Sequence, residues 1–160
     1  MVTMKISYIF SKNKQYGSRL ISWSTWKFVQ EVSAGLSKES VPSHVAVLID
    51  DLYVVESTML SGVRIIPYST WLRINDQLFK VEDEDRSAKF IEEKLMSVWG
   101  KRYDWLGVLF FSLKLIFKRL PKENKWQNSK TFFCTEFAAR VSGLDGGNIT
   151  PASLYLELTK

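Results

Sequence analysis

Two residues of this chain, Cys134 and His44, are of the types that perform thiol catalysis, and each is the only one of its kind among 160 residues. A cysteine nucleophile needs a base that takes its proton or stabilises its thiolate, and imidazole is the usual partner. If the protein performs thiol chemistry with a histidine, only this pair can do it. The alternative is that the lone cysteine packs in a hydrophobic core, as free cysteines often do.

Cys134 lies near the start of a segment with helical spacing, FFCTEFAARV. Either Ser129 or Thr131 could cap this helix, which would place Cys134 in its first turn. Unpaired N–H groups and the helix dipole stabilise an anion there, which favours a reactive thiolate. However, Phe137 and Val141 follow on the same helical face, so a packing role predicts an inward-facing sulfur equally well.

His44 opens an apolar segment, SHVAVLID, whose composition predicts a strand. In a strand over residues 43–49, His44 shares one face with Ala46 and Leu48, and the residues of the other face are apolar as well. A histidine between two buried faces needs hydrogen-bond partners, whether its role is structural or catalytic.

Glu56 is the candidate for a third group, which would accept a hydrogen bond from the second ring nitrogen of His44. It interrupts the apolar run LYVVEST, in a strand expected to form a β-hairpin with the His44 strand around Asp50-Asp51. The two side chains share a face only when the numbers of paired residues sum to an even value. A loop of three or five residues gives such a register, and a two-residue turn does not. Pairing of Leu48 with Leu52 would place His44 directly opposite Glu56.

Other chemistry has less support in the sequence. An exposed carboxylate at the end of a strand is the alternative role for Glu56, and Asp104 and Glu136 are weaker candidates for the third group. Glu136 lies two residues from Cys134, so it points away from the sulfur on a helix. The chain has no Gly-rich phosphate loop, GxSxG, HExxH or EF-hand motif, and one Cys with one His is too few for a structural zinc site. No metal and no cofactor is therefore expected.

The pattern along the chain predicts one α+β domain over residues 1–160, with antiparallel strands between helical segments. Strands are expected at Lys5–Phe10, Ser43–Ile49, Leu52–Ser57, Val63–Ile66 and Gln77–Val81, with a polar loop at Ser11–Gln15. Helices are expected at Gly17–Val32, Glu84–Trp99, Trp105–Phe117 and Phe132–Ser142, with short helical pieces at Thr70–Arg73 and Pro151–Leu156.

Composition narrows the partners and the location. Hydrophobic residues make up 46% and aromatic residues 14% of the chain, which argues against long disordered segments. The net charge is +5, but Lys and Arg are scattered, so a nucleic-acid partner is not expected. No secretory signal is evident, and a cytoplasmic or virion-associated location is expected.

The segment Trp105–Phe117, WLGVLFFSLKLIF, is the most apolar part of the chain. It is too short to span a membrane, which requires about twenty residues. A buried helix is the first interpretation. Peripheral membrane contact, assisted by nearby basic residues, is the alternative.

The order of these parts, with a strand histidine first, then Glu56, then a helix cysteine, resembles the circularly permuted branch of the NlpC/P60 superfamily. These are the YiiX/YebB-like proteins of papain-like fold, found in bacteria and their phages. The motifs that carry the resemblance are SRLISWSTW, SHVAVLID, VVEST followed by GVRIIP, GKRYDW, FFCTEFAARV and TPASLY, over about residues 17–156. Trp105–Phe117 and the loop PKENKWQNSK depart from the family pattern.

The resemblance implies a small antiparallel sheet packed against the cysteine helix. It also implies a cysteine peptidase or amidase with Cys134 as nucleophile, His44 as base and Glu56 as the third polar residue, acting on peptides such as those of peptidoglycan. Two alternatives stay open. One is a lipid acyl hydrolase or acyltransferase at a membrane surface, and the other is a catalytically silent structural or virion protein of the same fold.

Overall fold

The computed structural model describes residues 4–14, 36–37, 40–58, 61–83, 87–99, 134–144 and 150–160. Over these ranges the chain is α+β, as the sequence predicts. The strands are β1 (Ile6–Asn13), β2 (His44–Ile49), β3 (Tyr53–Thr58), β4 (Gly62–Pro67) and β5 (Asn75–Asp83). The helices are α2 (Tyr68–Ile74), α3 (Ala88–Val98), α5 (Cys134–Val141) and α6 (Pro151–Leu158).

The five strands form one antiparallel sheet in the order β4-β3-β2-β1-β5. β2, which begins with His44, is therefore the central strand. Its sequence, HVAVLI, is apolar at successive positions because both of its faces are covered. A central strand of this kind holds its side chains in fixed positions, which suits a site that needs a defined geometry.

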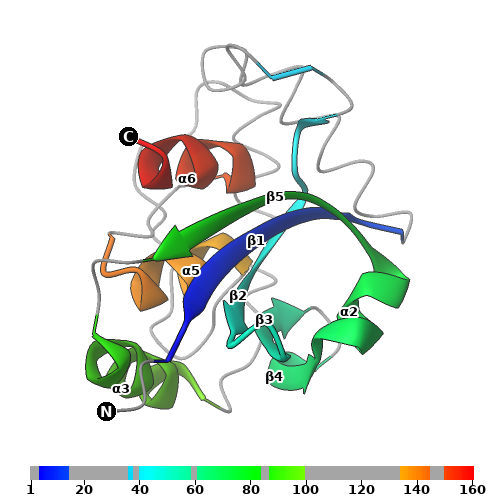
Figure 1. Ribbon diagram of the computed structural model, residues 1–160. Coiled ribbons are helices and arrows are strands. Elements are labelled where there is room, and N and C mark those ends of the chain that lie inside the picture. The colour runs from blue at the N-terminus through cyan, green and yellow to red at the C-terminus, as the bar shows by residue number, and fades with distance from the viewer. Residues whose placement is uncertain are drawn as a thin grey trace.

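Helices cover both faces of the sheet (Figure 1). On one face, α3, α5 and α6 pack on a core that includes Tyr8, Phe10 and Val47. On the other face, α2 places the fully buried Trp71 on Leu48 and its neighbours. The alternation of side chains along β1 and β2 sorts the apolar residues between these two cores.

The ends of α5 and α6 follow from their sequences. Gly143, with φ 74°, ends α5: its N–H bonds to the Arg140 carbonyl, and the next N–H bonds to the Ala139 carbonyl. Thr150 caps α6 through a capping box with Ser153, and Pro151 occupies the first helical position. These caps fix where each helix begins or ends against the sheet.

Most of the expected strands and helices are present, but the end of β1 and the start of α3 differ from the prediction. Ser11–Gln15 was expected as a loop, which is wrong for Ser11–Asn13, because β1 continues there and pairs with β5. Helix α3 begins after Ser87 instead of at Glu84, because Ser87 is extended and accepts a hydrogen bond from the Phe90 N–H. The expected helices Gly17–Val32 and Trp105–Phe117 and the loop PKENKWQNSK lie outside the described residues. Among the helices that are described, none has the length and apolar character needed to cross a membrane.

Candidate active site

The β2–β3 hairpin brings His44 and Glu56 to the same face of the sheet. Leu48 pairs with Val54, so the numbers of paired residues sum to an even value, as the shared face requires. Leu48 does not pair with Leu52, and His44 is consequently diagonal to Glu56 by two residues instead of directly opposite it. The even register is confirmed, and the directly opposed arrangement is wrong.

The turn of this hairpin explains the even register. Asp50 and Asp51 both have positive φ, at 52° and 57°, and the Leu52 N–H donates to the Ile49 carbonyl at 2.9 Å. This is the geometry of a two-residue turn, which alone would send Glu56 to the opposite face. However, Ile49 pairs with Tyr53, so Leu52 is one additional residue in the loop. That single residue reverses which side chains of β3 face His44.

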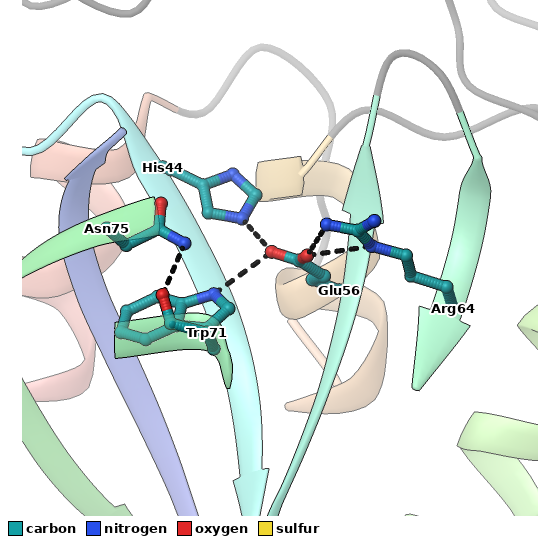
Figure 2. A network of polar contacts seen from close by, with 5 residues as sticks. All are labelled: His44, Glu56, Arg64, Trp71 and Asn75. Atoms are coloured by element: carbon teal, nitrogen blue, oxygen red, sulfur yellow. Dashed lines mark hydrogen bonds and ion pairs between the residues drawn. The ribbon is translucent and has the colours of Figure 1, made fainter. Parts of the chain in front are cut away.

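Glu56 is the centre of a buried polar network at the start of β2 (Figure 2). Its side chain is 1% exposed, so the alternative of an exposed strand-end carboxylate is wrong. Oε2 lies 2.7 Å from His44 Nε2 and accepts from Trp71 Nε1 at 3.0 Å. Oε1 accepts from Arg64 Nε at 3.0 Å and from Arg64 Nη2 at 2.6 Å.

The donors around Glu56 determine its protonation state. Indole and guanidinium nitrogens only donate hydrogen bonds, so the carboxylate oxygens accept all of the bonds from Trp71 and Arg64. A carboxylate that accepts several such bonds is stabilised as the anion. His44 Nε2 then carries a proton and donates a hydrogen bond to Oε2. The second ring nitrogen, Nδ1, is left for another partner.

The pKa values of the pair agree with this assignment. Burial raises the pKa of Glu56, but the hydrogen bonds and charges of His44 and then of Arg64 outweigh it and bring the pKa to about 2. Burial lowers the pKa of His44, but hydrogen bonds and charges at Cys134 and Glu56 outweigh it and raise the pKa to about 10. The ring is therefore protonated and the carboxylate ionised at neutral pH.

Cys134 is the other partner of the His44 ring. It is the first described residue of α5, which packs on β2 and β3, and its side chain hydrogen-bonds with His44. Figure 2 shows α5, in pale orange, beginning beside the ring. Because Glu56 occupies Nε2, Nδ1 is the ring nitrogen that is left for the sulfur. Cys134 is 7% exposed and belongs to the apolar core, so the sulfur is both packed and in contact with the base.

The structure thus brings together the three residues predicted from the sequence, Cys134, His44 and Glu56. Of the weaker candidates for the third group, Glu136 is a buried residue of α5, and Asp104 lies outside the described residues. The expected helix caps Ser129 and Thr131 lie outside them too.

Sequence reasoning missed Arg64 and Trp71. Arg64 is the only charge in the strand GVRIIP, and it pairs directly with Glu56 across β3 and β4. That cross-strand position could have been found once the register was assumed. Trp71 carried no local signal, because a tryptophan in a short helix is usually a packing residue.

A thiol, a protonated imidazole and an ionised carboxylate that contact one another in this order are the groups that nucleophilic acyl chemistry requires. Within the described ranges, no group of three His, Cys, Asp or Glu side chains is placed to hold a metal ion. No family model, no curated protein and no solved structure matches this chain.

Proposed function

We propose that the protein is a thiol hydrolase, an amidase or peptidase that cleaves acyl bonds with Cys134, His44 and Glu56. The observation that carries this proposal is the His44 ring, which contacts the ionised Glu56 through Nε2 and Cys134 through its other side. A cysteine that only packs in a core does not need a buried imidazole beside it whose positive charge is stabilised by a carboxylate.

Each residue has a defined part in the reaction. His44 holds the proton released by the Cys134 thiol and is therefore an imidazolium beside the sulfur, and the sulfur attacks the carbonyl carbon. The C–N bond of the substrate then breaks while His44 gives its proton to the leaving amine, which leaves an acyl group on the sulfur. Water, deprotonated by the now neutral His44, attacks this thioester; the C–S bond breaks, the acyl group leaves as a carboxylic acid, and the sulfur–imidazolium pair is restored.

Glu56 orients the ring during these steps. Since Oε2 holds the proton on Nε2, the nitrogen that exchanges protons with the sulfur and the leaving group is always Nδ1. The negative oxygen formed on the attacked carbonyl would be stabilised by backbone N–H groups at the start of α5, which have no partner within the helix.

The proposed fold is the permuted papain-like arrangement of the NlpC/P60 superfamily. Its support is the chain order, with the histidine strand β2 before the cysteine helix α5, and the packing of α5 on an antiparallel sheet. By the same resemblance we propose peptide amides as the substrate class. Lipid esters would use the same three residues.

An acyl-electrophile probe with mass spectrometry tests this function. The wild-type protein should form one adduct, on Cys134, and the rate of labelling at about pH 7 should fall about 100-fold in His44→Ala, which is the range of general acid–base effects. Cys134→Ala should give no adduct. Lys80→Met serves as a matched control, because Lys80 binds carboxylates at the surface, apart from Glu56.

Equal labelling rates in the wild type and in His44→Ala would contradict the function. Failure of the folded wild-type protein to react at all would contradict it as well and would favour a silent protein of this fold.

A further inference from the structure

We propose that Arg64 and Trp71 are positioning residues that hold the Glu56 carboxylate ionised and aimed at His44. Both residues donate hydrogen bonds to Glu56, so both would act through its carboxylate. This inference rests on the proposed thiol site, because it describes how the third residue of that site is held.

Arg64 fixes one oxygen of the carboxylate from the neighbouring strand. It lies directly opposite Glu56 in the β3–β4 register, and both Nε and Nη2 bind the same oxygen, Oε1. The side chain of Arg64 is 33% exposed, whereas that of Glu56 is 1% exposed. The guanidinium therefore closes the outer side of the network and gives the buried anion a permanent positive partner.

Trp71 fixes the other oxygen from the opposite direction. It comes from α2, is fully buried, and donates from Nε1 to Oε2, the oxygen that also binds His44. The backbone of Trp71 is held in turn, because Asn75 donates to its carbonyl from both the main-chain N–H and the side-chain amide. The indole N–H therefore approaches Glu56 from a fixed point, as Figure 2 shows.

Together the two residues leave the carboxylate a single orientation. Rotation of the carboxylate plane away from this orientation would break the bonds to Arg64, Trp71 and His44 at once. Because both hydrogen bonds from the guanidinium go to Oε1, Oε2 is the oxygen that binds the imidazole. Loss of either donor should loosen this orientation, and with it the placement of Nδ1 against Cys134.

The lone histidine makes the inference testable without any substrate. In the wild type, we expect one ring N–H proton of His44 to be protected from water by Glu56 and to give a resolved downfield NMR signal. Arg64→Met and Trp71→Phe should broaden or remove this signal through faster exchange. Arg64→Lys, which keeps the charge, should restore it in part. Tyr68→Phe is the matched control on α2, because it removes a hydrogen bond to Gln77 only, and it should leave the signal unchanged.

Alkylation of Cys134 provides the second readout. Arg64→Met and Trp71→Phe should each lower the rate about tenfold, the scale of effects for groups that orient a functional residue. In a Glu56→Gln background, neither change should lower the rate further, because the residue through which they act is already gone.

An unchanged His44 signal in folded Trp71→Phe and Arg64→Met would overturn the inference. So would alkylation rates that these two changes lower as much in the Glu56→Gln background as in the wild type. If Cys134 proves inert while the His44 signal responds as described, the proposed function fails and the positioning role stands. If Cys134 is reactive but the His44 signal is unchanged by replacement of Arg64 and Trp71, the positioning role fails and the proposed function stands.

Discussion

The sheet carries two clusters of opposite charges, one at each end of its central strands, and they differ in burial. At the start of β2, Glu56 binds His44 and Arg64 with a side chain that is 1% exposed. At the hairpin end, Lys5 and Lys80 bind Asp51 and Glu82 with side chains that are 26% to 46% exposed. Contacts of similar length thus occur in two different dielectric environments.

The electrostatic consequences differ accordingly. Lys80 and then Lys5 lower the pKa of Asp51, but water competes for these groups and ions screen them. The buried network moves the pKa of Glu56 to about 2 and that of His44 to about 10. A fixed protonation state therefore depends on burial with complete hydrogen bonding, and the number of ion pairs matters less.

The largest difference between the clusters should be seen when one carboxylate is replaced in each. Glu56→Gln should destabilise the fold by about 3 to 5 kcal/mol, because it leaves the buried donors of His44 and Trp71 without an anion. A glutamine amide cannot substitute, since its NH2 group is itself a donor facing donors. Urea unfolding measures the change in the free energy of unfolding.

Asp51→Asn is the matched control at the exposed cluster, and it should not shift the urea midpoint measurably. Equal losses of stability in the two variants would refute the difference between the clusters.

A second difference should appear in the pH dependence of stability. The folded pKa of His44 is raised to about 10, so its contribution is complete below its ordinary value of about 6.5 and is lost as the pH rises towards about 10. That of Glu56 is lowered to about 2, so its contribution is complete above about 4.5 and is lost as the pH falls towards about 2. The network is thus most stabilising between about pH 4.5 and 6.5.

Between about pH 6.5 and 9, the wild type should lose up to about 3 kcal/mol relative to His44→Ala, in which the titrating ring is absent. Unfolding by urea at the two pH values measures this relative loss. Equal losses of stability in the two proteins would contradict this prediction, because they would show that His44 has the same pKa in the folded and the unfolded chain.

The smallest expected effect is the response to salt. Between about 0.1 M and 1 M salt, the Debye length falls from about 10 to about 3 Å, which weakens the exposed ion pairs. The pKa of Asp51 should then move towards its ordinary value, while that of Glu56 should not change. Carboxyl NMR titrations measure both groups in one sample, and a shift of Glu56 as large as that of Asp51 would show that water reaches the buried network.

The sequence predicted the strands and the three site residues because those signals are local. The alternation in β1, the apolar run of β2 and the isolated Glu56 in β3 can each be recognised within a few consecutive residues. The register was predictable only as a condition, since it depended on whether Leu52 belonged to the loop. No local pattern distinguishes a two-residue turn at Asp50-Asp51 from the same turn with one added residue.

The remaining members of the site could not be predicted because their contacts are tertiary. Trp71 meets Glu56 only because α2 folds back on the face of the sheet that carries His44, and a helical propensity does not specify that docking. The contact between Arg64 and Glu56 depends on the pairing of β3 with β4, which is the next pair of strands along the chain. Both become evident only when the sheet is assembled.

We propose that Cys134 is an activated nucleophile and does more than pack in the core. The most direct measurement compares the rate of iodoacetamide alkylation at about pH 7 in the folded protein with the rate for the same chain in urea, where the thiol is exposed and ordinary. The lone cysteine makes the rate unambiguous. We expect the folded protein to react faster than the unfolded chain, and we expect His44→Ala to remove this advantage. A folded rate below the unfolded rate would contradict this proposal, because that is the behaviour of a thiol protected by burial alone.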